Sequence, residues 1–223
     1  IQDGMRQRVS RNFKKFIDVR FESDKDVAMQ SRHLEIDIAI DLGGFTLGSR
    51  TGIFSYRAAP IQINYLGYPG TMGAKYMDYI IADQTVIPEE NKKYFSEKII
   101  YLPITYITDD SLRTSSDFSQ QRELFNLPVN KFIFCCFNNS YKISPLILNS
   151  WSKILLNVPN SIILISANNL FFQKSILTFF ESTNINSNRI FFANKIDKMD
   201  TYLARYSVCD LFLDTFPYTA HST

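Results

Sequence analysis

The sequence is short of chain-breaking and cross-linking residues, and it contains no long apolar run. Its 223 residues include only 8 Gly and 8 Pro, which excludes a collagen-like or linker-like chain. Every apolar run is shorter than the about 18–20 residues that span a bilayer. Residues 1–20 also lack the apolar region of a secretory signal. We interpret the three Cys as buried small hydrophobic residues of a reducing compartment, and we expect a cytoplasmic protein without a membrane span.

An excess of charge of one sign is also missing. Lys and Arg number 24 and Asp and Glu number 22, so the formal net charge is +2. A chain so nearly balanced has no general field for a polyanion, and we do not expect it to bind nucleic acid. Hydrophobic residues make up 45%, which is enough for a core and excludes a disordered chain. The chain begins at Ile1 and stops at Thr223 without a closing element, so we interpret it as a fragment.

Several sequence motifs of known chemistry are absent. There is no Cys/His cluster with zinc spacing, no P-loop, no G-x-S-x-G and no complete G-x-G-x-x-G. The residues Asp24-Lys-Asp26 spell the D-x-D of metal-dependent sugar transferases. They open a predicted helix directly after Ser23, however, and we interpret them as negative charge that complements the helix dipole. We therefore expect no metal site.

What the sequence does contain is a series of short apolar runs, several of which are β-branched or aromatic and apolar throughout. Such runs are typical of parallel strands that are buried on both faces. The runs are Phe16–Val19, Ile36–Leu42, Ile61–Leu66, Tyr79–Ala82, Ile99–Leu102, Phe132–Phe137, Ser161–Ser166, Ile190–Ala193 and Leu211–Leu213. Helix-like stretches lie between several of them, at Ser23–Arg32, Ser144–Val158, Leu170–Phe180 and Lys198–Ser207. This alternation predicts an α/β fold with parallel sheets.

The alternation is interrupted between Pro103 and Val129, where polar, turn-forming sequence predominates. A fresh βαβ pattern begins at Phe132. We therefore predict an N-terminal lobe over residues 1–110, a linker over 111–130 and a C-terminal lobe over 131–223. Each lobe is short for a complete doubly wound domain.

Candidate ligand-binding loops follow four of the predicted strands. They are Asp41–Thr46 with its glycine pair, Leu66–Gly73 with three glycines and a proline, Phe137–Pro145 with Lys142, and Asp214–Thr223 with His221. In open α/β sheets, ligands bind outside the carboxyl ends of the strands. Exposed backbone N–H groups, a lysine and hydroxyls are all suited to a phosphate. Each segment alone also fits an ordinary turn or a solvated loop.

Together and in this order, these segments resemble the catalytic region of the O-GlcNAc transferase family. That family includes bacterial relatives with tetratricopeptide repeats and the SPINDLY-type O-fucosyltransferases. The resemblance extends from about residue 12 to the end. The matching stretches are Ile36–Thr46, Arg57–Gln62, Leu66–Thr71, Met77–Ile80, Tyr94–Lys98, Phe137–Ile143, Val158–Ser161, Asn188–Ile190, Asp210–Thr215 and His221–Thr223.

The resemblance implies a GT-B architecture, in which two Rossmann-like lobes hold the donor in the cleft between them. Both lobes would be incomplete in this chain. It also implies an inverting glycosyltransferase that needs no metal or cofactor. Such an enzyme moves a sugar from a nucleotide-sugar donor, here expected to be UDP-GlcNAc, to Ser or Thr hydroxyls of an acceptor protein.

The resemblance also assigns roles to individual residues. Lys142 matches the family's essential lysine, which implies contact with the diphosphate. We expect Lys142 and His221 to face each other across the cleft, near the Gly67 loop. The other implied donor-binding residues are Asn139, Leu66, Gly67, Pro69, Lys198, Tyr202, His221, Ser222 and Thr223.

Some expected parts of the family pattern are missing. Tyr202 stands where the family often has a His, which leaves the choice of nucleoside open. The histidine discussed as a catalytic base, the acidic residue that follows the phosphate-binding segment, and the tetratricopeptide repeats are not in this chain. Asp37 and Asp41 remain as candidate bases, although strand-end turns also account for them. We expect the 223-residue chain alone to be inactive.

Other functions stay open on the sequence. The protein could be an O-fucosyltransferase that uses GDP-fucose. It could be a module that binds a nucleotide sugar without catalysis. It could also be another GT-B enzyme, such as an epimerase that acts on the free sugar nucleotide.

Overall fold

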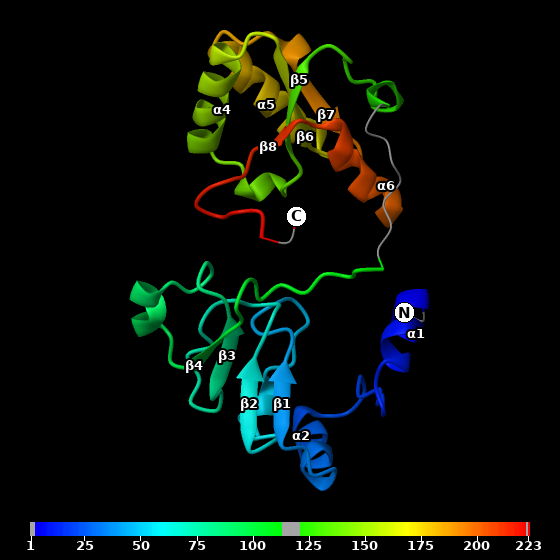
Figure 1. Cartoon of the computed structure of the whole chain (residues 1–223), viewed down its shortest axis with the longest axis vertical. Helices are drawn as coiled ribbons and strands as arrows, with labels where there is room; N and C mark the ends of the chain where they lie inside the picture. The colour runs from blue at the N-terminus through cyan, green and yellow to red at the C-terminus, as the bar shows by residue number, and fades with distance from the viewer. Residues whose placement is uncertain (1–2, 113–120, 222) are drawn as a thin grey trace. The chain divides into compact units, whose positions relative to one another are not determined.

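The structure is a computed structural model that describes residues 3–112, 121–221 and 223. The chain divides into two compact units, residues 1–109 and 110–223, and each is built on a four-stranded parallel sheet (Figure 1). The α/β fold with parallel sheets that the apolar runs predict is therefore confirmed. In the described part of the chain, none of the helices has both the length and the apolar character needed to span a bilayer.

The first unit contains strands in the order β1-β2-β3-β4, which is also their order along the chain. They are β1 (Ile38–Asp41), β2 (Ile61–Asn64), β3 (Tyr79–Ala82) and β4 (Lys98–Tyr101). The helices of this unit are α1 (Gly4–Arg11), α2 (Asp24–His33), α3 (Gly52–Ser55) and the 3-10 helix η1 (Glu89–Tyr94). Ser23 caps α2 by accepting a hydrogen bond from Asp26 N, so the D-x-D motif opens a helix as predicted.

The predicted strand at Phe16–Val19 is wrong, because these residues form no strand. Their side chains are engaged locally with charged neighbours. The Arg6 guanidinium lies 5.2 Å from the centre of the Phe16 ring and 2.7 Å from an Asp18 oxygen. Phe16 also remains exposed, so the segment lacks the two-sided burial on which the prediction depends.

The second unit contains strands in the order β7-β6-β5-β8. They are β5 (Phe132–Cys136), β6 (Ser161–Ser166), β7 (Ile190–Ala193) and β8 (Leu211–Phe212). The helices are α4 (Pro145–Asn157), α5 (Leu170–Ser182), α6 (Met199–Ala204) and the 3-10 helices η2 (Arg122–Phe125), η3 (Ser140–Lys142), η4 (Ser187–Arg189) and η5 (Arg205–Val208). The chain builds outward from β5 to β7 and then returns to place β8 on the other side of β5. Such a reversal of strand order is where open α/β sheets bind ligands.

Both faces of this second sheet are buried, each in a core of its own. Phe134 and Cys136 pack with α4 and α5 on one face. Ile133 and Cys135 of the same strand point to the opposite face, where Val208 of η5 packs. In Figure 1, α6 lies on the other side of the sheet from α4 and α5. Because successive strand residues point to opposite faces, burial on both faces explains why the run Phe132–Phe137 is apolar throughout.

The segment 111–130, predicted as a linker, contains η2 in its described part. Arg122 of η2 donates hydrogen bonds to the carbonyl oxygens of Val208 (3.0 Å) and Lys131 (2.8 Å). It also pairs with the Asp210 carboxylate at 2.8 Å. These contacts attach η2 to the residues that lead into β5 and β8.

Candidate functional site

Lys142 lies in the segment that follows β5, at the point where the strand order reverses. It ends η3, and its side chain is buried, with 9% of its surface exposed. Its Nζ atom donates hydrogen bonds to the carbonyl oxygens of Thr219 (2.9 Å) and Ala220 (3.3 Å), and it lies 4.1 Å from the centre of the Tyr218 ring. Among the described residues it forms no ion pair. A buried ammonium group is costly without an anionic partner, so this position is suited to binding an anion.

The segment after β8 forms a closed turn around one carboxylate and one hydroxyl. Asp214 Oδ1 accepts hydrogen bonds from the backbone N–H groups of Thr215 and Ala220, both at 2.7 Å. The Thr215 hydroxyl donates to Tyr218 O at 2.6 Å. This turn holds the two carbonyl oxygens that face Lys142, and it leads directly into His221.

Asn138 joins this turn to the end of β5. Its side chain is fully buried, and its Nδ2 atom donates to Asp214 Oδ1 (3.1 Å) and Thr215 Oγ1 (2.8 Å). Its Oδ1 atom is buried without a hydrogen-bond partner in the described part of the chain. The structure shows that its amide nitrogen is used to hold the two segments together.

The structure brings Lys142 close to the residues before His221, and both belong to the second unit. The expectation that they face each other across the cleft is therefore wrong, since both lie within the C-terminal lobe that is predicted over 131–223. The parallel sheet itself explains the difference, because it places the carboxyl ends of β5 and β8 side by side. Asn139, a predicted donor-binding residue, is exposed at the start of η3. Ser222 lies outside the described residues, and Thr223 is exposed.

Two further predicted residues lie at the start of α6 and within it. Lys198 precedes the helix and is exposed, whereas Tyr202 is half-buried. The Tyr202 ring lies 4.9 Å from the guanidinium carbon of Arg205. The half-buried Tyr202 ring therefore packs beside a cationic side chain.

Arg205 is a residue that sequence reasoning missed. Only 3% of it is exposed, its guanidinium lies 3.8 Å from the centre of the Phe137 ring, and its burial lowers its pKa. It donates to Asn194 O at 3.2 Å, while its Nε atom is buried without a partner among the described residues. A cavity of about 250 Å³ adjoins it, lined also by Thr201 and Asn194. The sequence does contain a signal, because Arg205 follows Tyr202 by three residues in the predicted helix Lys198–Ser207. Residues three apart lie on one face of a helix.

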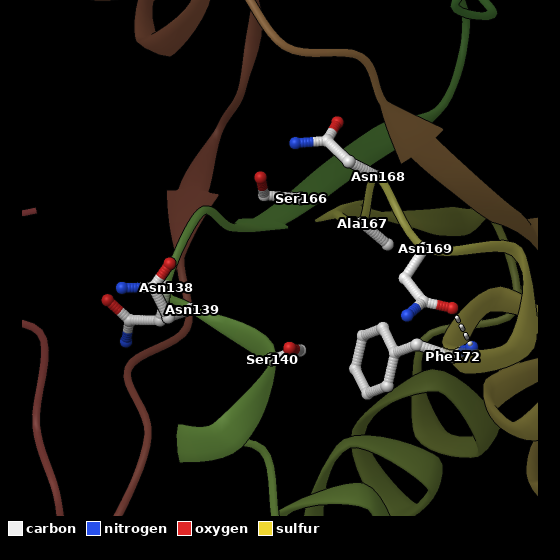
Figure 2. A pocket seen from close by; sticks show the side chains of 8 residues that line it. All are labelled: Asn138, Asn139, Ser140, Ser166, Ala167, Asn168, Asn169 and Phe172. Carbon is white, nitrogen blue, oxygen red and sulfur yellow. Dashed lines mark hydrogen bonds between the residues drawn. The ribbon is translucent and has the colours of Figure 1, made fainter.

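A second cavity of about 160 Å³ lies at the carboxyl ends of β5 and β6 (Figure 2). It is lined by residues that follow β5, residues at and after the end of β6, and one ring from α5. These residues are Asn138, Asn139, Ser140, Ser166, Ala167, Asn168, Asn169 and Phe172. None of them carries a charge.

The predicted residues Leu66, Gly67 and Pro69 lie in the first unit, in the loop after β2. Asn64, buried at the end of β2, donates to Tyr68 O (2.9 Å) and Gly70 O (3.3 Å) and so fixes this loop. Gly67 packs against the residues that follow β1, because a Cβ atom there would lie 2.5 Å from Leu42 O. Asn64 is the second residue that sequence reasoning missed.

The two candidate bases occupy opposite ends of β1. Asp37 is exposed and precedes the strand. Asp41 ends the strand, and its Oδ1 atom accepts hydrogen bonds from Gly43 N (2.9 Å) and Gly44 N (3.0 Å). Asp41 therefore serves the turn, as one reading of the sequence holds. Among residues 3–112, 121–221 and 223, no three His, Cys, Asp or Glu side chains gather where they could hold a metal ion.

Two Rossmann-like units with parallel sheets define the GT-B class of glycosyltransferases. A solved structure of a mutant O-GlcNAc transferase from Thermobaculum terrenum matches this chain with a TM-score of 0.83 and 25% sequence identity. The match covers 99% of this chain and 41% of that one. Within this class, the chain belongs to glycosyl transferase family 41, whose model matches residues 2–118 and 113–223.

Curated relatives agree with this assignment. A probable UDP-N-acetylglucosamine–peptide N-acetylglucosaminyltransferase of Arabidopsis thaliana, SEC, is 34% identical over 223 residues. A SPINDLY protein with the same description from Eustoma exaltatum is 30% identical over 221 residues. Both alignments cover 98% of this chain but only 23% and 24% of the relatives. The chain thus spans about a quarter of the length of these relatives.

Proposed function

We propose that this protein transfers a sugar from a nucleotide-sugar donor to Ser or Thr hydroxyls of acceptor proteins. The observation that carries the proposal is Lys142, a buried ammonium group at the strand-order reversal that has no carboxylate partner among the described residues. A nucleoside diphosphate is the leaving group of such a transfer, and its negative charge needs a fixed cation. The names of the relatives support UDP-GlcNAc as the donor.

The proposed reaction is a single inverting displacement without a metal ion. The acceptor oxygen attacks the anomeric carbon, the bond from that carbon to the diphosphate oxygen breaks, and the acceptor proton leaves to a base. Lys142 would exchange its backbone carbonyl contacts for diphosphate oxygens, which are charged and therefore stronger partners. His221, Ser222, Thr223 and Asn139 would complete the phosphate site. We expect the base outside this chain, because Asp41 is engaged in a turn and Asp37 is exposed at the far end of β1.

The nucleoside would lie against α6. Tyr202 offers a ring for stacking, and it lies beside the buried Arg205 and a cavity of about 250 Å³. An aromatic ring beside a guanidinium suits a nucleobase, which has both a π-face and carbonyl acceptors. The sugar would be bordered by the Leu66, Gly67 and Pro69 loop, and tetratricopeptide repeats in the rest of the protein would select the acceptor.

The test is a transfer assay with the longest native form of the protein, because the chain covers only 23% of its Arabidopsis relative. The protein is incubated with a Ser/Thr peptide and either UDP-GlcNAc or GDP-fucose in the presence of EDTA, and the peptide is analysed by mass spectrometry. We expect GlcNAc on the peptide. We expect Lys142→Ala to slow transfer at least about 100-fold, as loss of a transition-state contact does. Lys153→Ala, at an exposed lysine of α4, is the matched control and should transfer normally.

The other outcomes separate the alternatives. Transfer from GDP-fucose alone would reassign the protein to O-fucosylation. Binding of a nucleotide sugar without any transfer would identify a non-catalytic module. Transfer that stops with EDTA and returns with a divalent cation would contradict the metal-independent mechanism.

A further inference from the structure

Glu97 is a buried carboxylate at the start of β4. Only 5% of its surface is exposed, and it directly precedes Lys98, the first residue of the strand. It forms no ion pair among the described residues. A carboxylate that is buried without a cation is costly unless N–H and O–H groups donate to it. The donors to Glu97 therefore indicate which part of the fold it stabilises.

These donors come from the loop after β2 and from the neighbouring Ser96. Met72 N donates to Glu97 Oε1 at 2.6 Å, and the Thr71 hydroxyl donates to Glu97 Oε2 at 2.7 Å. The Ser96 hydroxyl donates to the same Oε2 atom at 3.2 Å. Thr71 Oγ1 in turn accepts hydrogen bonds from Gly73 N (3.1 Å) and Ser96 N (3.3 Å). One carboxylate thus joins the end of the loop to the start of β4.

Two buried side chains fix this loop from two different parts of the sheet. Asn64 of β2 donates to the carbonyl oxygens of Tyr68 and Gly70. Glu97 holds the two residues that come next along the chain. The loop is therefore restrained both at the end of β2 and from β4.

The restrained loop contains an unfavourable backbone conformation. Leu66 has a φ of +74°, in the left-handed region that bulky residues rarely adopt. Such a conformation persists only where the surrounding contacts hold it. Leu66, Gly67 and Pro69 are the residues that the proposed function places beside the donor sugar. Because Glu97 itself is buried, it would act on that sugar only through the loop.

We propose that Glu97 is a positioning residue of the sugar transfer, and that it fixes the loop beside the donor sugar through Thr71 and Met72. The inference rests on the proposed function, because that function places the sugar at this loop. It adds that the placement of the sugar depends on Glu97, whereas binding of the nucleotide, which is assigned to the second unit, does not.

The experiment separates the sugar from the nucleotide. Initial rates of the longest native form of the protein are measured with a Ser/Thr peptide and varied UDP-GlcNAc, and UDP is added as a competing inhibitor. The variants are Glu97→Ala, Glu97→Gln and Thr71→Val. Asp83→Ala is the matched control, because Asp83 is another buried carboxylate of the first unit and accepts its backbone hydrogen bonds from outside the loop. Rates are expressed per folded protein, with the folded fraction measured by circular dichroism.

We expect Glu97→Ala to lower kcat/KM for UDP-GlcNAc about tenfold to 100-fold, because a small displacement of a substrate-positioning group costs that much. The inhibition constant of UDP should stay within twofold. Glu97→Gln should recover most of the rate, because its amide oxygen can accept from Met72 N and its amide nitrogen can donate to Thr71 Oγ1. Thr71→Val, which loses the hydroxyl alone, should lower kcat/KM about threefold to tenfold. Asp83→Ala should transfer normally per folded protein.

The possible failures are distinguishable. If the unmodified protein transfers no sugar, the proposed function fails together with this inference. If it does transfer and Glu97→Ala behaves as Asp83→Ala does, the role of Glu97 is structural and the inference alone is overturned. Equal losses of donor and UDP affinity, or a Glu97→Gln variant as slow as Glu97→Ala, would overturn it too. Should Glu97→Ala fail to fold, a normal kcat/KM in Thr71→Val would have the same consequence.

Discussion

Replacing Asn138 by Ala should loosen the junction between β5 and the turn after β8. The Asn138 side chain is fully buried, and it is the group through which the end of β5 holds Asp214 and Thr215, 76 and 77 residues further along the chain. Without the amide, this turn loses a support that lies beside its contact with Lys142. We expect both the stability of the second unit and the shape of the Lys142 site to suffer.

The magnitude follows from the bonds that are lost. The bond to the Thr215 hydroxyl contributes about 1 kcal/mol, and the bond to the Asp214 carboxylate about 2 kcal/mol, because one partner is charged. The unpartnered Oδ1 atom of Asn138 already costs about 1 kcal/mol as a buried, unsatisfied acceptor, and the substitution removes that cost. The net loss in the free energy of unfolding should therefore be about 2 kcal/mol.

Urea denaturation followed by tryptophan fluorescence measures this loss. The single Trp of the chain, Trp151, is a residue of α4 and is 2% exposed in the core, so its emission reports on the second unit. With a slope of about 2 kcal/mol per molar urea, the midpoint should fall by about 1 M. Asn139→Ala is the matched control, because Asn139 is exposed and its side chain makes no hydrogen bond in the described part of the chain; its midpoint should hardly move. Equal midpoints for the two variants would refute the reasoning.

Two further predictions concern the first unit. The Asp83 carboxyl is buried, and burial by itself raises its pKa. The backbone N–H groups of Val86, Tyr106 and Thr85 donate hydrogen bonds to it, and together they outweigh burial, so the net effect lowers the pKa of Asp83. The ionised carboxylate therefore stabilises the fold above its unfolded pKa of about 4, and this stabilisation is lost as the pH falls through its lower pKa in the folded protein. In Asp83→Asn, the free energy of unfolding should consequently decrease less steeply with falling pH. Denaturation followed by circular dichroism at several acidic pH values measures this. An unchanged decline would show that other groups cause it. Gly67→Ala would place a Cβ atom 2.5 Å from Leu42 O, so we expect a loss of about 1–3 kcal/mol in thermal melts. Gly4→Ala, with open space around the new atom, should melt normally, and equal melting of the two variants would count against the packing argument.

The fold is largely predictable because the local signals agree with the final burial. The runs Tyr79–Ala82, Ser161–Ser166 and Ile190–Ala193 match β3, β6 and β7 residue for residue. The helix predicted from Ser144 also forms, with Ser144 accepting a hydrogen bond from Ile147 N and Pro145 in its first turn. The run Phe16–Val19 fails because an apolar run does not report whether its two faces become covered.

The site is less predictable, because its contacts join residues that are distant in sequence. The residues around Asn138 in the sequence do not predict its hydrogen bond to Thr215. The residues around Asn64 likewise do not predict that its side chain donates to two carbonyl oxygens of the following loop. Arginine is a residue type that usually lies on the surface, yet the packing of α6 and η5 on the sheet buries Arg205 against Phe137. The resemblance to a family selected Lys142, and the predicted C-terminal lobe already includes both Lys142 and His221. The structure adds that Lys142 Nζ contacts the carbonyl oxygens just before His221.

A diphosphate site at Lys142 is tested by the affinity of this chain for UDP with and without Lys142. Isothermal titration calorimetry compares the unmodified chain, Lys142→Ala and the surface control Lys153→Ala, with circular dichroism to establish that each is folded. We expect Lys142→Ala to bind UDP at least about tenfold more weakly, because a buried cation that faces a diphosphate is lost, while Lys153→Ala binds as the unmodified chain does. Equal affinity in all three proteins would contradict a diphosphate site at Lys142.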